Sequence, residues 1–263
     1  MENRKYQVRR PERKRPPSGD MAFGVQPVLE TLRSGKEIER LFIQRELGMN
    51  ELVKLAESMQ IAIHRVPLEK LNRLTRKNHQ GVVCFLSPIR YAPIHNVLSQ
   101  VYEEGKVPLF LLLDRVTDVR NFGAIVRSAE CAGVQAVIVP SKGGAMINAD
   151  AMKTSSGALN YMPICREENL VSTVRYLLDS GLQCVACTEK SSSALYGTDF
   201  TTPTVIIMGS EEDGISQELL DLSGERVSIP LLGEVESLNV SAAASVILYE
   251  TVRQRLKQLP SGK

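Results

Sequence analysis

The chain has 263 residues, of which 43% are hydrophobic and 24% charged, and its formal net charge is +2. This length and composition predict a globular α/β protein of one large or two modest domains, with a core that needs no disulfide or structural metal. The near balance of charge points to no class of partner. No apolar run approaches the roughly 20 residues that cross a bilayer, and the N-terminus shows no secretory signal. We therefore expect a cytoplasmic protein with no membrane partner.

The cysteines and histidines favour neither disulfides nor a metal site. Five cysteines, without a framework spacing, fit a reducing compartment. Cys184 and Cys187 form a C-x-x-C pair, but the residues around them are typical of a buried strand. Positions i and i+3 of a strand point to opposite faces, so we expect two core cysteines. The three histidines are scattered, and we expect no bound metal.

Residues 1–20 are predicted to be a disordered basic arm. Seven of the first fifteen residues are Lys or Arg and two are Glu, and prolines at 11, 16 and 17 prevent a helix. Such an arm either attracts a phosphate backbone or only aids solubility. The sequence favours neither interpretation.

Residues 21–87 predict a small α/β domain. Helical spacing occurs around residues 28–32, 52–56 and 68–74, and strand patterns around 41–43, 61–63 and 82–86. After the third helix comes a polar cluster that suits a phosphate or a splayed base, although a solvated helix end is the alternative. The residues of this cluster that we expect to bind RNA are Arg76, Lys77, Asn78, His79 and Gln80.

Residues 88–106 are interpreted as a linker followed by an entering helix over 94–102. The larger unit, residues 107–263, predicts strands around 109–113, 137–139, 185–187, 204–208 and 226–229. Helices are expected over 122–129, over 170–178 with Asn169 as the N-cap, and from 241 to about 258. Apolar strands that alternate with helices are typical of a mostly parallel sheet covered on both faces.

Three polar loops follow apolar strands of this unit, at residues 114–127, 209–214 and 231–241. Ligands of open α/β sheets lie beyond the carboxyl ends of the strands, so these loops are expected to converge on one crevice. The dinucleotide and P-loop glycine patterns are missing, and so is the G-x-S-x-G elbow of esterases. From chemistry alone, the chain is a small-ligand α/β enzyme of unspecified type.

Three ordered segments then carry a resemblance. Leu113–Ala129, Ile206–Ser216 and Ile229–Ala244 resemble the three motifs of the SpoU (TrmH) family, RNA 2′-O-methyltransferases of the SPOUT superfamily. The segment that ends at His79-Gln-Gly81 is similar to the small, ribosomal-protein-like substrate-binding domain of many members. Val119, Arg120 and Phe122 depart from the usual first motif. The resemblance implies a trefoil-knotted parallel-sheet domain over 107–263, S-adenosylmethionine as cofactor and a homodimer.

The resemblance also implies roles for individual residues. Arg127 matches the residue beside the acceptor hydroxyl, and its role as the literal base is a hypothesis, because arginine normally stays protonated. The other expected catalytic residues are Asn121, Glu211, Ser237 and Asn239. Cofactor contacts are expected from Gly209, Gly214, Ile229, Leu231 and Leu238, and further RNA contacts from Lys153 and Ser155. Without the resemblance, ordinary loop capping would explain Asn121, Glu211, Ser237 and Asn239.

The function implied is methyl transfer from S-adenosylmethionine to a ribose 2′-hydroxyl. The separate N-terminal domain favours rRNA as the substrate, and the arrangement most resembles the bacterial 23S rRNA guanosine 2′-O-methyltransferases, so a guanosine of 23S rRNA is expected. Two alternatives remain open: a tRNA 2′-O-methyltransferase, and a non-catalytic RNA-binding factor of ribosome assembly. The second would not need Arg127, Glu211, Ser237 and Asn239 together.

Overall fold

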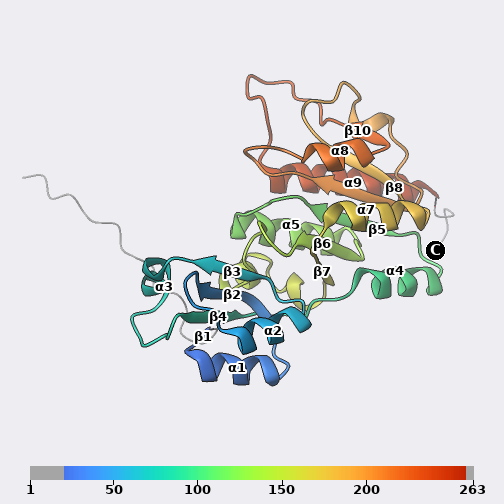
Figure 1. Cartoon of the computed structure of the whole chain (residues 1–263). Coiled ribbons are helices and arrows are strands. Elements are labelled where there is room, and N and C mark those ends of the chain that lie inside the picture. Colours follow the sequence, from blue (N-terminus) through green and yellow to red (C-terminus); the bar gives the residue numbers. More distant parts are fainter. Residues whose placement is uncertain (1–20, 259–263) are drawn as a thin grey trace, which may run out of the picture.

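The computed structural model describes residues 21–258, which form two α/β domains joined near residue 92 (Figure 1). The predicted basic arm lies outside the described residues.

The N-terminal domain is a four-stranded sheet covered on both faces. Its elements are β1 (Met21–Phe23), α1 (Val25–Arg33), β2 (Ile38–Gln44), α2 (Asn50–Ser58), β3 (Ile63–Val66), α3 (Leu68–Leu74) and β4 (Val82–Leu86), and the strand order is β1-β4-β2-β3. Strands β2 and β3 pair parallel and the other pairs are antiparallel. Leu41 and Ile43 face α1 and α2, whereas Phe42 faces α3, because successive strand residues point to opposite faces.

The second domain is a six-stranded sheet in which every pair of neighbours is parallel, in the order β10-β8-β9-β5-β6-β7. Its first elements are α4 (Ile94–Glu103), β5 (Leu109–Leu113), α5 (Val119–Cys131), β6 (Ala136–Pro140), α6 (Ala149–Thr154), η1 (Ala158–Asn160), β7 (Ile164–Glu167) and α7 (Leu170–Asp179). There follow β8 (Gln183–Cys187), η2 (Leu195–Gly197), β9 (Thr204–Met208), α8 (Gln217–Leu222), β10 (Glu225–Val227) and α9 (Val240–Gln258).

Helices cover both faces of this sheet, as the continuous apolar strands predict. On β5, Leu111 packs with the face under α5, α6 and α9, whereas Leu112 packs with the face under α4, α7 and α8. Helix α4 thus belongs to the core of the second domain. The two core cysteines are confirmed, because Cys184 is buried on the second face and Cys187 packs against the first.

The predicted helices and strands all occur, with ends that shift by a few residues. Asn169 caps α7 by accepting a hydrogen bond from the Ser172 backbone N–H at 3.0 Å. Strand β1, helix α6, strand β7 and helix α8 were not predicted, because each has only three to six residues and too few apolar positions to show a period. The knot stays a prediction.

A buried carboxylate joins the two domains. Glu39 of β2, with a side chain only 5% exposed, accepts hydrogen bonds from the Tyr91 hydroxyl and, at 2.8 Å, from the backbone N–H of Ile147. Arg166 of β7 lies 3.8 Å from the same carboxylate, and its guanidinium stacks 3.9 Å from the Tyr91 ring centroid. These contacts hold the N-terminal domain in one orientation against the sheet of the second domain.

Candidate active site

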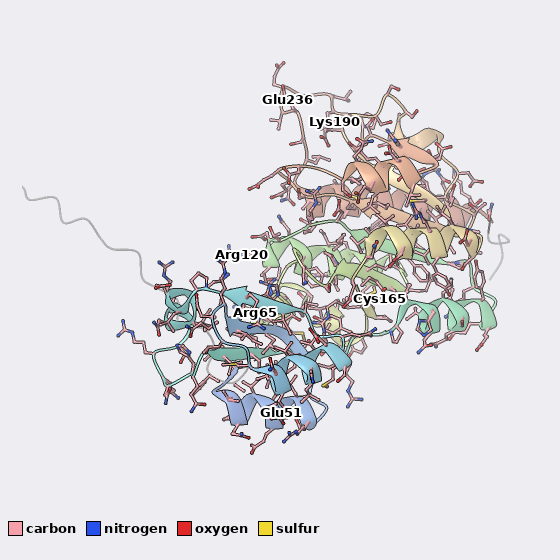
Figure 2. The ribbon with its side chains drawn as sticks, viewed as in Figure 1. Glu51, Arg65, Arg120, Cys165, Lys190 and Glu236 are labelled. Atoms are coloured by element: carbon pink, nitrogen blue, oxygen red, sulfur yellow. The ribbon has the colours of Figure 1, made fainter. Side chains whose placement is uncertain are left out.

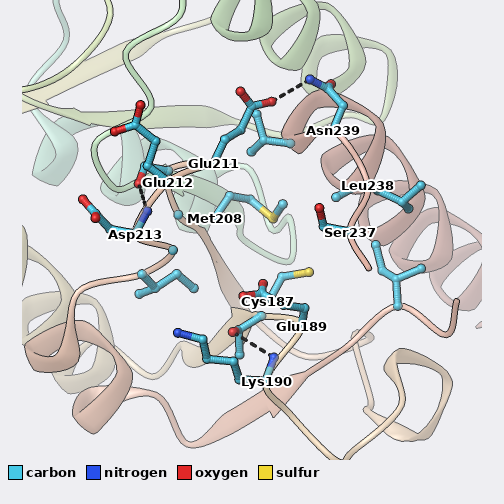
Figure 3. Close-up of a pocket in the computed structure, with 18 of the residues that line it drawn as sticks. Cys187, Glu189, Lys190, Met208, Glu211, Glu212, Asp213, Ser237, Leu238 and Asn239 are labelled. Carbon is cyan, nitrogen blue, oxygen red and sulfur yellow. Dashed lines mark hydrogen bonds between the residues drawn. The ribbon is translucent and has the colours of Figure 1, made fainter. Parts of the chain in front are cut away.

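The three polar loops meet at one edge of the second sheet, as parallel strands require. β10, β8, β9 and β5 are successive parallel neighbours, so the loops that follow β5, β9 and β10 leave from the same edge. The loops after β9 and β10 line a pocket of about 450 Å³, shown in Figure 3, and the loop after β5 lines the cavity beside it. This volume lies within the roughly 300–1,000 Å³ that is usual for pockets of small molecules and cofactors.

The floor of the pocket is a tight turn that needs glycine. The backbones of Ser210 and Gly214 exchange hydrogen bonds of 3.1 and 3.0 Å, and Gly214 has a φ of +70°. A Cβ on Gly209 would lie 2.2 Å from the carbonyl carbon of Gly214, closer than any side chain can come. The close approach of the two strands of this turn therefore requires glycine at position 209.

One carboxylate connects all three motifs. Glu211 Oε1 accepts hydrogen bonds from the side-chain amides of Asn121 at 3.1 Å and Asn239 at 2.7 Å, and the Asn239 amide also reaches Asn121 Oδ1 at 3.1 Å. Figure 3 shows Glu211 and Asn239 at the rim of the pocket. Asn239 also accepts from the backbone N–H of Ser241 at 3.0 Å, so it caps the start of α9 as well.

The first motif begins its helix in an ordinary way despite its unusual residues. Asp118 caps α5 by accepting from the backbone N–H groups of Arg120 and Asn121 at 2.9 and 2.8 Å. Val119 stands at the first helical position, where proline is also favoured because that N–H needs no partner. Valine at position 119, where this motif usually differs, therefore leaves the placement of Asn121 intact.

Sequence reasoning missed Arg115, which connects the first and second loops. Its guanidinium contacts Asp213 at 3.0 Å and the carbonyl of Gly214 at 3.1 Å. Buried Asp114 beside it accepts from the backbone N–H of Ser216 at 2.7 Å. A charged pair directly after an apolar strand is a signal in the sequence, but only the sheet order shows what it contacts.

A fourth loop also lines the pocket and was missed. Thr188, Glu189 and Lys190 follow β8 and face the second and third loops (Figure 3). The signal was available, because these polar residues directly follow a predicted strand. They were overlooked because the order of the strands along the chain does not show that β8 lies next to β9 in the sheet.

The lining of the pocket is predominantly acidic. Lys190 is its one cationic side chain within the described residues, against five carboxylates: Glu189, Glu211, Glu212, Asp213 and Glu236. Burial, followed by the charge of Glu189, raises the pKa of the Cys187 thiol to about 11. Such a pocket favours a cationic ligand and disfavours a polyanion.

The expected cofactor contacts all line the pocket, whereas two of the five catalytic candidates, Asn121 and Arg127, do not. Gly209, Gly214, Ile229, Leu231 and Leu238 all line the pocket, as do Glu211, Ser237 and Asn239. Asn121 lines an adjoining cavity.

Arg127 lines none of these cavities. It is exposed on α5, six residues after Asn121, and a helix of 3.6 residues per turn places it about 120° around the axis from Asn121. Between residues 21 and 258 no side chain forms a hydrogen bond or ion pair with Arg127. Within one copy of the chain, Arg127 therefore does not lie at the pocket, contrary to the expectation from the sequence.

Two of the expected RNA contacts, His79 and Ser155, are corrected by burial, and a third, the exposed Gln80, has its amide oxygen bonded internally. His79 is 6% exposed, with one ring nitrogen 3.0 Å from Asn72 Oδ1 and the other accepting from the Gly81 N–H at 3.0 Å. Gln80 Oε1 accepts from the Val25 N–H at 3.0 Å, at the start of α1. Ser155 is fully buried where α6 packs on α5. The remaining four candidates, Arg76, Lys77, Asn78 and Lys153, are exposed.

No helix of the described segment is long and apolar enough to cross a membrane. That same segment has no group of three His, Cys, Asp or Glu side chains arranged to hold a metal ion.

The pocket and its sheet define an α/β enzyme with a ligand site at the carboxyl edge of parallel strands. The profile of the SpoU rRNA methylase family matches residues 108–249, and the RNA 2′-O ribose methyltransferase substrate-binding profile matches residues 21–92. A Staphylococcus saprophyticus protein assigned to the TrmH family of tRNA/rRNA methyltransferases is 34% identical over 235 residues, covering 88% of this chain and 94% of that protein.

Solved structures agree. An AdoMet-bound rRNA methyltransferase from Sinorhizobium meliloti is similar at a TM-score of 0.57 with 26% identity, covering 89% of this chain and 87% of that one. The AdoMet complex of the SpoU methyltransferase AviRb from Streptomyces viridochromogenes has a TM-score of 0.54 and 26% identity, over 90% of both chains. The chain belongs to the SpoU (TrmH) family of RNA methyltransferases, whose cofactor is S-adenosylmethionine.

The residues of the pocket fit that cofactor. The carboxylates that line the pocket complement a sulfonium cation. Backbone groups of the 209–214 turn and the side chains of Ile229 and Leu238 would hold it.

Proposed function

We propose that this protein methylates a ribose 2′-hydroxyl of RNA, and that the acceptor is a guanosine of 23S rRNA. The observation that carries the proposal is the side-chain cluster of Asn121, Glu211 and Asn239, which ties three separate loops together at the rim of one acidic pocket. A simple RNA-binding factor has no need of such a pocket next to its RNA-binding domain.

The bound cofactor supplies an electrophilic methyl group, and the chain supplies position and charge. Alignment of acceptor and methyl group provides much of the rate, and the linked loops hold the pocket in one shape for that purpose. Ser237, exposed at the pocket rim, would hydrogen-bond the acceptor sugar or its phosphate. Arg127 would bind the phosphate next to the hydroxyl, where its positive charge favours loss of the hydroxyl proton.

The position of Arg127 supports a homodimer. The exposed guanidinium of Arg127 lies about 120° around α5 from Asn121. An acceptor ribose that contacts both Arg127 and a cofactor pocket would therefore take Arg127 from one copy of the chain and the pocket from the other. Mixing an Arg127→Ala protein with a Glu211→Ala protein tests this arrangement. We expect the two variants, each impaired when alone, to regain part of the activity together, because one mixed site keeps both groups. Mixtures without any recovery would contradict a shared site.

The substrate is tested by mapping ribose methylation across rRNA and tRNA in cells that lack this protein. We expect one 23S rRNA guanosine to lose its methyl group and to regain it when the gene is restored. Loss at a tRNA position instead would replace the rRNA substrate with tRNA. A map without any change would contradict the enzymatic proposal.

A further inference from the structure

A second cavity lies between the two domains, away from the cofactor pocket. Its volume is about 380 Å³. Arg40 of β2 and His64 of β3 line it from the N-terminal domain, and Thr117, Val119 and Gly144 line it from the other domain. Figures 1 and 2 show β3, which carries the labelled Arg65, alongside the beginning of α5, where Arg120 is labelled.

The surroundings of this interdomain cavity are cationic. No carboxylate of the described chain lines it. His64 lies within it, and the charges of Arg40, Lys142 and Lys70 act on its ring: burial first, and then these three cations, lowers the pKa of His64 from its usual value. The contrast with the acidic cofactor pocket is sharp, because that pocket holds five carboxylates.

Arg40 is held in place without being neutralised. Its Nη2 donates to the carbonyl oxygen of Gly144 at 2.8 Å, across the domain boundary. That is its one hydrogen bond to the described residues, and none of their carboxylates forms an ion pair with it. A guanidinium has five N–H donors, so a half-buried, oriented cation keeps most of its donors for a ligand.

The cavity that Asn121 lines, of about 280 Å³, has lining residues in common with both of these cavities. It shares Thr117 and Gly143 with the interdomain cavity, and Glu211 and Asp213 with the cofactor pocket. The three cavities are therefore adjacent, in a row from the domain boundary to the side-chain cluster around Glu211.

We propose that the interdomain cavity binds the phosphodiester backbone of a single-stranded RNA segment adjacent to the target nucleotide. This inference rests on the proposed function, since it supplies the same reaction with its substrate. The carboxylates of the cofactor pocket repel an RNA strand, so the phosphates of that strand need a cationic site nearby. Arg40 and its cationic neighbours provide such a site at the interdomain cavity. Only the target ribose then enters the acidic end.

The test uses the full-length protein, a fluorescein-labelled short single-stranded RNA and fluorescence anisotropy. Arg40→Gln keeps an amide donor for Gly144 but loses the charge, and Lys142→Glu reverses an exposed charge. We expect each to weaken RNA binding by about tenfold and to lower the slope of log affinity against log salt by about 0.7 for each lost phosphate contact. Arg40→Lys should restore most of the affinity. Lys54→Glu, at an exposed position of α2, is the matched control and should bind RNA like the unaltered protein.

Calorimetry with S-adenosylmethionine separates this proposal from the proposed function. We expect all four variants to bind the cofactor unchanged and to melt at the temperature of the unaltered protein. Unchanged RNA affinity and salt slope in Arg40→Gln and Lys142→Glu would overturn the cavity assignment while leaving the proposed function intact. Displacement of the RNA by millimolar inorganic phosphate at constant ionic strength would also overturn it, because it would indicate a site for a simple anion. Failure of the unaltered protein to bind the cofactor would instead remove the proposed function.

Discussion

The side-chain amide of Asn239 donates a hydrogen bond to Asn121 Oδ1 at 3.1 Å, although 118 positions separate the two residues along the chain. One lies at the beginning of α5 and the other directly before α9, and these two helices pack side by side. The contact fixes the third loop against the first, so the shape of the cofactor pocket depends on helix packing as well as on the loops.

Removal of the shared acceptor should loosen all three loops. Glu211→Ala takes away the oxygen that both amides contact, and we expect methyl transfer to fall roughly 10- to 100-fold, the kinetic equivalent of one or two charge-assisted hydrogen bonds. Glu211→Gln keeps an acceptor oxygen and should lose less. Single-turnover assays on both proteins measure the difference. Equal rates for Glu211→Ala and the unaltered protein would show that the cluster does not organise the site.

The turn beneath the pocket should reject even one methyl group. Gly209→Ala would place a Cβ 2.2 Å from the carbonyl carbon of Gly214, and we expect a loss of about 1–3 kcal/mol in the free energy of unfolding together with loss of cofactor binding. Urea unfolding and calorimetry measure the two effects. Gly224→Ala is the control, because its Cβ would enter open space, and it should stay within about 0.5 kcal/mol. Normal cofactor affinity in Gly209→Ala would contradict the close approach.

Arg127 should matter for catalysis alone. Arg127→Ala removes an exposed side chain that forms no hydrogen bond or ion pair with another side chain of residues 21–258, so we expect its free energy of unfolding to change by less than about 0.5 kcal/mol. Cofactor binding should persist while methyl transfer falls by about 100-fold or more. Retained turnover would show that Arg127 has no role at the acceptor.

The hydrogen bond of the Tyr91 hydroxyl at the domain contact should contribute measurably to the free energy of unfolding. Burial, and then the charge of Glu39, raises the pKa of Tyr91 above its usual range, so its hydroxyl stays protonated and donates to that carboxylate. Tyr91→Phe leaves the carboxylate one donor short and should lower the free energy of unfolding by about 1–3 kcal/mol. Tyr176→Phe, at an exposed position on α7, should have no comparable effect. Equal unfolding curves for the two variants would rule out a stabilising role for the Tyr91 contact.

A thiol-alkylating reagent should label the exposed cysteine before the buried ones. Burial raises the pKa of Cys84 to about 11 and that of Cys165 to about 12, so both remain protonated thiols at pH 8, and the thiolate is the reactive form. We expect iodoacetamide to label exposed Cys131 first, as peptide mass spectrometry would show, and Cys131→Ser to remain unlabelled on the same timescale. Because the unfolded thiol of Cys84 ionises near 9.0, its contribution to stability is complete below that pH and is lost as pH rises toward about 11. Labelling of Cys84 before Cys131 would contradict the burial.

Much of the architecture could be predicted from local pattern. The run Leu109–Leu113 predicts a strand covered on both faces, and Val28, Leu29 and Leu32 predict the buried face of α1, because burial repeats with the period of the element. The motif residues could be named for the same reason, since Gly209, Glu211 and Asn239 stand at recognisable spacings in contiguous segments.

Other features depend on neighbours that are distant in sequence. A polar residue such as His79 has the same pattern whether it faces solvent or closes a loop, and only the packing shows that both of its ring nitrogens are used internally. Lys190 enters the pocket because β8 lies next to β9, an order that no local period encodes.

The sequence by itself therefore determined the longer elements, the parallel class of the larger sheet and the identity of the motif residues, because periodicity and spacing are local properties. The tertiary structure alone decided which loops share a pocket, that Arg127 lies outside it, and that Arg40 meets Gly144 across the domain boundary. Those relations arise from strand order and from the packing of one domain on the other, which are set by the burial of the whole chain.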